Sequence, residues 1–188
     1  MDCHVANASR NDMTSFVKHD SQKMINIRPA TESDFDEIYR IFKSVIAGEN
    51  TYVNRADTTK EEVYAKWMDK KSKSFVAEIP GEISKKIVGV YLIKPNQVDL
   101  GSHIANASYI VDENTRGAGV GKALALHSIA KAKELGYRAM QFNFVVSTNE
   151  AAVNLWKSVG FRIIATVPQG FKHSTLGYVD SYIMFREL

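Results

Sequence analysis

Hydrophobic and polar positions along this chain follow two periods, and the change of period marks the predicted elements. Apolar residues spaced three and four positions apart predict helices, whereas short apolar runs bounded by Gly or Pro predict strands. The predicted helices end near residues 46, 71, 135 and 159. The predicted strands lie at residues 25–29, 74–79, 87–93, 104–111, 138–146, 162–167 and 178–185, which gives the order β-α-α-β-β-β-α-β-α-β-β.

Capping residues and one apolar stripe support the helices. Thr31 with Asp34 opens the first helix, and Thr58 and Thr59 open the second. The first helix carries apolar residues at helical spacing, and core packing is the commonest fate of such a stripe. Its members are Phe35, Ile38, Tyr39, Phe42 and Val45.

Composition places these elements in one domain. The chain has 188 residues, 45% of them hydrophobic, which is enough for a full core in a single unit. Residues 1–23 are rich in Asn, Ser, Asp and Thr and lack an apolar period. We therefore expect a flexible N-terminal tail at residues 1–23 and a single domain at residues 24–188.

Charge and cysteine content exclude several classes of protein. The net charge of +3 is small and the basic residues are dispersed, so nucleic acid is not an expected partner. The single cysteine, Cys3, cannot form an internal disulfide, which suits a reducing compartment. The chain has neither an apolar run long enough to cross a bilayer nor a signal-peptide core at its start. These features predict a soluble cytoplasmic protein without a membrane partner.

The most informative stretch is Arg116-Gly117-Ala118-Gly119-Val120-Gly121-Lys122, between a predicted strand and the long predicted helix. Such a turn gathers backbone N–H groups and the positive end of a helix dipole at one point, where a pyrophosphate can bind. The glycines allow close approach of the anion, and Arg116 adds a fixed positive charge. A tight turn without a ligand is the alternative interpretation.

Two commoner phosphate-binding loops are excluded by register. A Walker A loop needs glycine at position 116 and a hydroxyl at position 123, where this chain has Arg116 and Ala123. A dinucleotide-binding fingerprint that starts at Gly117 needs glycine at position 122, which is Lys122. The pattern that is left is Arg-x-x-Gly-x-Gly.

A second motif follows one helix and one strand later, and reads Asn149-Glu150-Ala151-Ala152-Val153-Asn154-Leu155-Trp156-Lys157-Ser158-Val159-Gly160-Phe161. It has an Asn cap, nearly three helical turns and a Gly stop. Together the two motifs resemble the GCN5-related N-acetyltransferase (GNAT) superfamily. Its acetyl-CoA pyrophosphate loop is Arg-x-x-Gly-x-Gly, and its last conserved segment is Asn-x-x-Ala-x-x-Leu-Tyr-x-x-x-Gly-Phe. The resemblance covers the chain from about residue 25 to residue 188.

The resemblance implies a fold of the α/β (α+β) class. A central mixed, mostly antiparallel sheet of about seven strands would be flanked by four helices, with two central strands splayed into a V that admits the cofactor. Family habit also favours a homodimer. Segments 90–96, 102–103 and 142–146 look like the branch that contains fungal enzymes acetylating proline analogues.

The resemblance further implies acetyl-CoA as the acyl donor, without a metal. The pyrophosphate would rest on the N–H groups of residues 117–122, and the pantetheine arm would run along residues 109–111. Asn149 matches the Asn that bonds the pantetheine amide, although a plain helix cap also explains it. The implied cofactor-binding residues are Tyr109, Ile110, Val111, Arg116, Gly117, Ala118, Gly119, Val120, Gly121, Lys122, Asn149 and Trp156.

Trp156 is where the chain departs from the family. The matching position often carries a tyrosine proposed as general acid, and an indole cannot release a proton near neutral pH. The conjugate thiol of the leaving thiolate has a pKa of about 8.5, so the thiolate can leave without a proton from the enzyme. The lack of a general acid at position 156 therefore need not abolish turnover. We expect Trp156 to be a core aromatic residue beside the cofactor.

The two central strands carry amides and a hydroxyl instead of a carboxylate base. Asn106 shares a strand face with Ser108, and Gln141 shares one with Asn143, because residues two apart point to the same side. These side chains either line a crevice or form cross-strand hydrogen bonds. Asn106 and Asn143 are the candidate catalytic residues.

Because the two central strands carry amides and no carboxylate base, they suit an acceptor amine that is partly neutral at pH 7. A lysine-like amine of pKa about 10.4 is neutral in fewer than about 0.1% of molecules at pH 7, whereas an α-amino group of pKa near 8 is about 10% neutral. We therefore predict a small amino-acid-like acceptor that attacks acetyl-CoA directly in a ternary complex. Its predicted binding residues are Glu49, Tyr52, Asn106 and Asn143.

Two other functions stay open at this point. A protein N-acetyltransferase acting on lysine or an N-terminus would be favoured by an acidic groove, and the sequence has no acidic run to build one. A CoA-binding module without turnover is suggested by Trp156 and the missing base. Of the histidines, His173 is expected to face solvent in a loop at residues 168–182, a region that often shapes the acceptor pocket or a dimer contact. His127 is expected to be a packed or surface residue of the long helix.

Overall fold

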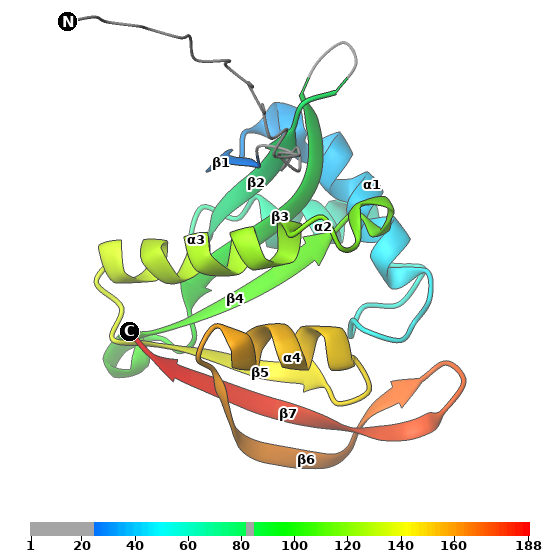
Figure 1. Ribbon diagram of the computed structural model, residues 1–188, viewed down its shortest axis with the longest axis vertical. Helices are drawn as coiled ribbons and strands as arrows, with labels where there is room; N and C mark the ends of the chain where they lie inside the picture. Colours follow the sequence, from blue (N-terminus) through cyan, green and yellow to red (C-terminus); the bar gives the residue numbers. More distant parts are fainter. Residues whose placement is uncertain (1–24, 82–84) are drawn as a thin grey trace, which may run out of the picture.

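The computed structural model describes residues 25–81 and 85–188, and the predicted tail at residues 1–23 lies outside this range. Within the described residues one seven-stranded sheet has the order β1-β2-β3-β4-β5-β7-β6 (Figure 1). The strands are β1 (Asn26–Pro29), β2 (Lys73–Ile79), β3 (Lys86–Pro95), β4 (Ile104–Val111), β5 (Ala139–Val146), β6 (Arg162–His173) and β7 (Gly177–Glu187). The helices are α1 (Phe35–Ile46), α2 (Lys60–Trp67), α3 (Val120–Glu134) and α4 (Glu150–Ser158), with single 3-10 turns at Glu32–Asp34, Asp99–Gly101 and Glu113–Thr115.

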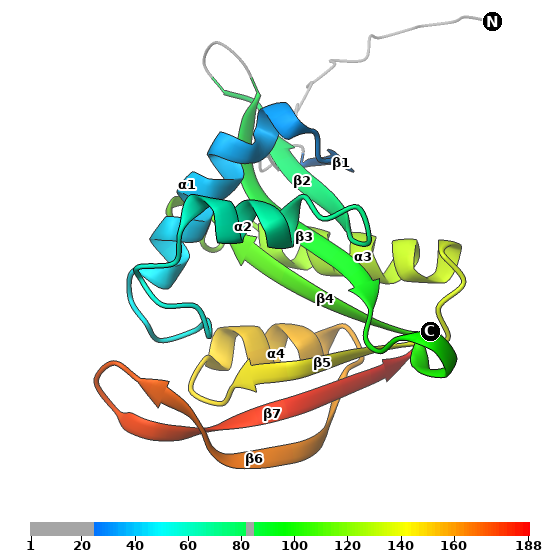
Figure 2. The ribbon, with the colours of Figure 1, turned by 180° about the vertical axis from the view of Figure 1, so that it is seen from behind.

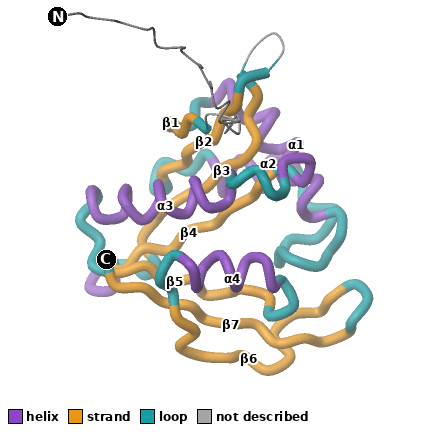
Figure 3. Tube along the Cα trace, in the orientation of Figure 1, coloured by secondary structure: helices purple, strands orange, loops and turns teal. Residues whose placement is uncertain are grey.

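The helices cover both faces of the sheet, as Figures 1 and 2 show from opposite sides. One core lies between α1, α2 and strands β2 to β4, and its largest fully buried side chain is Trp67. A second core lies between α3, α4 and the opposite face, and it extends from Phe75 on β2 to Met184 on β7. The tube in Figure 3 shows how each pair of helices lies against the strands. No helix in residues 25–81 or 85–188 is both long and apolar enough to cross a membrane.

Strands β4 and β5 form the parallel pair of an otherwise antiparallel sheet. Their pairing in the described chain is limited to Ile104 with Ala139 and Ala105 with Met140, and beyond these positions the two strands diverge (Figure 1). The sheet therefore opens into a V at its centre. The mixed seven-stranded sheet with helices on both faces confirms the predicted fold class.

Three predicted elements differ in length from the structure. The second helix ends at Trp67 rather than near residue 71, because residues 69–73 carry no buried side chain that would anchor another turn. The last two strands are longer than predicted, so most of residues 168–182 is a hairpin and not a loop. A register shift between Val167 and Phe171 breaks the two-residue period of β6, which hides the continuation of this strand beyond residue 167.

Arg28 of β1 joins two buried carboxylates at the edge of the sheet. Its guanidinium donates to both carboxylate oxygens of Asp34, at 2.7 and 2.8 Å, and to Glu78 at 2.7 Å. Both acidic side chains are less than 10% exposed. The hydrogen bonds from Arg28 lower the pKa of Asp34 to about 2.

We expect Arg28→Met to lower the free energy of unfolding at pH 7 by about 2 kcal/mol, because the carboxylates of Asp34 and Glu78 lose their buried cation. The effect is smaller than for a fully buried pair, since Arg28 is 34% exposed and solvent screens it. The folded-state pKa of Asp34 is depressed, so its contribution is complete above about pH 4 and is lost as pH falls towards 2. Urea unfolding at pH 7 and pH 3 measures both effects.

A matched control for this prediction is Arg55→Met. The Arg55–Asp57 ion pair is 80% and 71% exposed, so its loss should change the free energy of unfolding by less than about 0.5 kcal/mol. Equal destabilisation by the two substitutions would contradict the role assigned to Arg28.

Candidate active site

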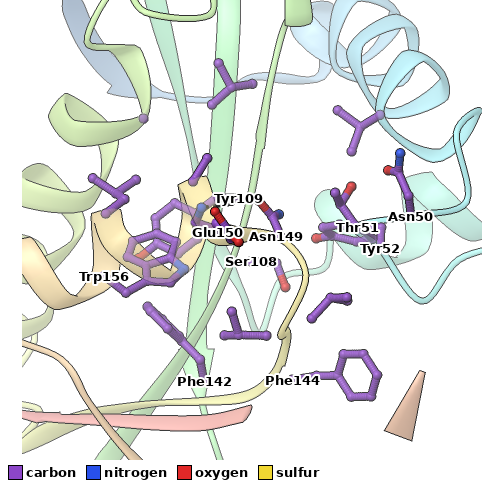
Figure 4. Close-up of a pocket in the computed structure, with 18 of the residues that line it drawn as sticks. Asn50, Thr51, Tyr52, Ser108, Tyr109, Phe142, Phe144, Asn149, Glu150 and Trp156 are labelled. Carbon is purple, nitrogen blue, oxygen red and sulfur yellow. Dashed lines mark hydrogen bonds between the residues drawn. The ribbon is translucent and has the colours of Figure 1, made fainter. Parts of the chain in front are cut away.

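A cavity of about 1020 Å³ opens where β4 and β5 separate. Its walls come from the glycine-rich turn before α3, both diverging strands, α4 and the loop between α1 and α2. Figure 4 shows Trp156 and Tyr109 on one side of this cavity and Asn50, Thr51 and Tyr52 on the other. The cavity is large enough for an extended ligand together with a small one.

The glycine-rich turn presents unpaired backbone N–H groups at one end of the cavity. Gly117 and Gly119 have φ values of 80° and 79°, and an added Cβ at either would meet no atom within 4 Å. Gly119 is the N-cap of α3 and offers no capping side chain. Among the described residues, no group accepts a hydrogen bond from the N–H of Gly119, Val120 or Gly121. Open space, free N–H groups and a helix N-terminus are what a pyrophosphate requires.

The predicted cofactor-binding residues divide by their position relative to this cavity. The side chains or backbone of nine line it, namely Tyr109, Val111, Arg116, Gly117, Gly119, Val120, Gly121, Asn149 and Trp156. Ala118 and Lys122 belong to the same turn but do not line the cavity, and the Ile110 side chain packs into the core beneath α1. Asn149 caps α4 by accepting a hydrogen bond from the N–H of Ala152 at 3.2 Å. The assignment of these residues to cofactor binding stays a prediction.

Trp156 lies in an aromatic wall and is 7% exposed. Its ring centroid is 4.7 Å from those of Tyr109 and Phe142. The Tyr109 hydroxyl is 2.7 Å from the Ser128 hydroxyl, and burial raises the pKa of Tyr109. Tyr109 is therefore held on the α3 side of the sheet and does not replace the tyrosine that this chain lacks at position 156.

Amides from three elements meet at the fork between β4 and β5. The Asn96 side-chain oxygen accepts hydrogen bonds from Asn106 of β4 at 3.0 Å and from Asn143 of β5 at 2.7 Å. Gln141 donates to the Asn143 side-chain oxygen at 2.8 Å. Asn106 and Asn143 also line the cavity, so both interpretations of these residues, a lined crevice and cross-strand hydrogen bonding, apply together. The orientation of each amide follows from this network.

Tyr52 and Ser108 both line the cavity, and their side chains lie near one another (Figure 4). The Tyr52 hydroxyl is buried and has no well-aligned hydrogen-bond partner among the described residues. Burial raises the pKa of Tyr52 to about 12, and the nearby Ser108 hydroxyl offsets part of that shift. Glu49 of the same loop does not line the cavity, and its carboxylate accepts the N–H of Ala56 at 3.4 Å.

Sequence reasoning missed Asn96, Lys66 and His173 as residues near the site. Asn96 follows β3, where its N–H donates to the Ile104 carbonyl at 2.8 Å, and only the folded sheet brings it to the fork. Lys66 of α2 lines the cavity. His173 also lines it and is half-buried, with Nδ1 accepting the N–H of Thr175 at 3.1 Å, so the expected solvent-facing position was wrong. The bulge in β6 concealed the strand that carries it.

Neither His127 nor a metal site adds a catalytic group within the described residues. His127 does not line the cavity, and its Nδ1 lies 2.8 Å from the Tyr91 hydroxyl, as a packed histidine would. No cluster of three or more His, Cys, Asp or Glu side chains within residues 25–81 and 85–188 could hold a metal ion.

A V-shaped opening with a glycine-rich turn at the start of a helix has the geometry that a pyrophosphate-containing ligand requires. The sequence model of the "Acetyltransferase (GNAT) family" matches residues 35–161, which is more than half of the chain. The chain therefore belongs to the Acetyltransferase (GNAT) family, which confirms the resemblance seen in the two motifs and the predicted class of acyl-CoA-dependent N-acetyltransferases.

Individual relatives agree with this family. A GCN5-related N-acetyltransferase from Kribbella flavida is 37% identical, with a TM-score of 0.81 over 87% of this chain and 98% of that one. The N-acetyltransferase aca1 of Schizosaccharomyces pombe is 33% identical over 98 residues, which are 52% of this chain and 47% of that protein. This chain thus spans about half the length of that fungal relative. The narrower branch of enzymes acetylating proline analogues stays a prediction.

A third relative matches at the level of the fold. A GNAT superfamily phosphinothricin acetyltransferase from Sinorhizobium meliloti, in complex with acetyl-CoA, has a TM-score of 0.76 at 17% identity, over 87% of this chain and 88% of that one. This similarity shows that the two proteins share a fold. A shared fold does not define the acceptor, which depends on the residues that line the cavity.

Proposed function

We propose that this chain transfers an acetyl group from acetyl-CoA to the amine of a small amino-acid-like metabolite. The observation that carries the proposal is the amide cluster of Asn96, Asn106 and Asn143 at the fork, of which the last two line the same cavity as the glycine-rich turn. One cavity thus offers an anion-binding end and a neutral polar centre. This pairing suits a pyrophosphate-containing donor beside an amine acceptor.

Acetyl-CoA, when bound, supplies an activated thioester carbonyl. The N–H groups of Gly119, Val120 and Gly121 would hold its pyrophosphate, and Arg116 at the rim would add positive charge. The fit is supported by the empty space in front of Gly117 and Gly119, which any side chain would occupy. The complex of the Sinorhizobium meliloti relative with acetyl-CoA agrees with this choice of donor.

The acceptor amine would be oriented by Asn106. The Asn106 side-chain oxygen makes no hydrogen bond among the described residues, so it can accept an N–H from the acceptor. The Asn143 oxygen already accepts a hydrogen bond from Gln141, so Asn143 offers the second N–H of its amide instead. Amides do not titrate near neutral pH, so the pKa of the acceptor itself sets the fraction of reactive amine.

The hydroxyl groups of Tyr52 and Ser108 would donate hydrogen bonds to charge that develops in the cavity. Tyr52 keeps its proton at neutral pH, since the ordinary pKa of a phenol is about 10 and burial raises that of Tyr52 to about 12. Its buried hydroxyl is a donor in the wall of the cavity near Ser108, whereas the indole of Trp156 belongs to the aromatic wall. We propose that Tyr52 donates a hydrogen bond to the reacting groups and does not act as a general acid.

Acetyl-CoA-dependent thiol release tests the proposal against a panel of amino acids, imino acids, polyamines and basic peptides. We expect release with α-amino or imino acids, at a rate that rises with pH towards the pKa of each amine, since the neutral amine is the nucleophile. Release with lysine peptides alone would establish a protein N-acetyltransferase instead. Acetyl-CoA binding without release for any amine would establish a binding module.

A further inference from the structure

Lys66 is a half-buried cation without an anionic partner. It lies on the last turn of α2 and lines the central cavity, with Nζ 5.0 Å from the centroid of the Tyr52 ring. No carboxylate in residues 25–81 or 85–188 forms an ion pair with it. Burial lowers the pKa of Lys66, and repulsion from Lys94 adds to that effect. The ammonium group is therefore held where its charge is poorly compensated.

Other partly buried cations of the described chain contact an acceptor within the protein. Arg28 contacts Asp34 at 2.7 Å, and Lys131 contacts Glu134 at 2.6 Å. Lys43 and Arg186 donate to the backbone carbonyls of Ala56 and Val159. A charge taken out of water needs such compensation, and a ligand can provide it as well as a side chain can. For Lys66, the ring face of Tyr52 supplies a partial substitute.

The position of Lys66 identifies which ligand group could complete the compensation. Of the described Lys, Arg, Asp and Glu residues, three line the cavity, namely Lys66, Arg116 and Glu150. Arg116 and Glu150 come from the glycine-rich turn and the start of α4, at the pyrophosphate end. Lys66 comes from α2 and lies beside Tyr52, on the side of the cavity where Figure 4 shows Asn50, Thr51 and Tyr52.

We infer that Lys66 binds a carboxylate of the acceptor, so that the acceptor class is an α-amino or imino acid. This inference rests on the proposed function and narrows its substrate. Lys66 would hold the carboxylate from α2 while the Asn106 oxygen holds the amine from β4, which directs the nitrogen towards the fork. Polyamines and basic peptides would be rejected, because Lys66 and Lys94 repel a second positive charge.

Matched acceptors test this inference, with each amino acid of the panel compared with its own carboxamide. Lys66→Gln should lower kcat/KM for the acid by about tenfold to a hundredfold, mainly through KM, because a charge-assisted hydrogen bond is lost. The same substitution should change kcat/KM for the carboxamide by less than threefold and leave KM for acetyl-CoA unaltered. Lys66→Arg should keep most of the preference for the acid. Lys70→Gln, an exposed position outside the cavity, is the matched control and should behave like wild type.

An equal loss for acid and carboxamide in Lys66→Gln would overturn the inference and assign Lys66 a purely structural role. If no amine supports turnover, the proposed function fails separately, and binding then decides the question. Calorimetric titration of the same amino acids in the presence of CoA should show binding to wild type and weakened binding to Lys66→Gln. Absent binding, or equal binding to both proteins, would overturn the inference.

Discussion

Replacing Gly121 by Asp should weaken acetyl-CoA binding at least about a hundredfold without unfolding the protein. Gly121 lies in the first turn of α3 and lines the cavity, so a carboxylate there would occupy the free N–H groups and repel the pyrophosphate. The fold should tolerate the change, because Gly121 is not among the residues with positive φ and its Cβ would lie 3.4 Å from the nearest Leu155 atom. Calorimetric titration of acetyl-CoA, with thermal unfolding beside it, measures both expectations.

Gly121→Ala is the matched control for this prediction. It adds the same Cβ without a charge and should strengthen the helix by up to about 1 kcal/mol. We expect its affinity for acetyl-CoA to stay within about tenfold of wild type. If Gly121→Asp binds acetyl-CoA as tightly as Gly121→Ala, the pyrophosphate does not rest on this turn.

Asn106→Ala and Asn143→Ala should each lower kcat/KM for the acceptor by at least about tenfold. Each substitution removes a hydrogen bond to the acceptor and also leaves the Asn96 oxygen with one donor fewer at the fork. The affinity for acetyl-CoA should stay unchanged, since both amides lie away from the glycine-rich turn. Steady-state kinetics with the best acceptor of the panel, and separate titration of acetyl-CoA, measure the two effects.

Two further variants distinguish residues that contact the acceptor from residues that only position those contacts. Asn96→Ala removes the shared acceptor but no proposed contact with the substrate, so we expect a smaller loss than for Asn106→Ala. Asn154→Ala changes an exposed residue of α4 outside the cavity and should have no effect. A loss below tenfold in both Asn106→Ala and Asn143→Ala would reject their assigned roles.

The glycine-rich end of the cavity could be predicted because its residues are consecutive. Residues 116–122 lead directly into the first turn of α3, so the local sequence alone specifies the free N–H groups and the open space beside Gly117 and Gly119. The same holds for Asn149 as the cap of α4. Hydrophobic periods predicted the order of the elements, and the resemblance to the GNAT superfamily implied the mixed sheet, which is why the fold class was predicted correctly.

The acceptor end could be predicted only in part, because it is assembled from distant segments. Asn96, Asn106 and Asn143 meet only when β3, β4 and β5 lie side by side and the last two diverge. Lys66 reaches the cavity from α2, whose sequence shows an ordinary charged surface helix. His173 was misplaced because the bulge in β6 interrupts the alternation that would have marked a strand.

The most direct measurement follows an isotope-labelled acetyl group from acetyl-CoA to a mixture of amino acids, polyamines and lysine peptides, with mass spectrometry of the products. We predict that the label appears on the nitrogen of an α-amino or imino acid with the wild-type protein, and that Gly121→Asp abolishes this transfer at limiting acetyl-CoA. Label that stays on CoA with every acceptor, or that appears on lysine side chains alone, would contradict the account.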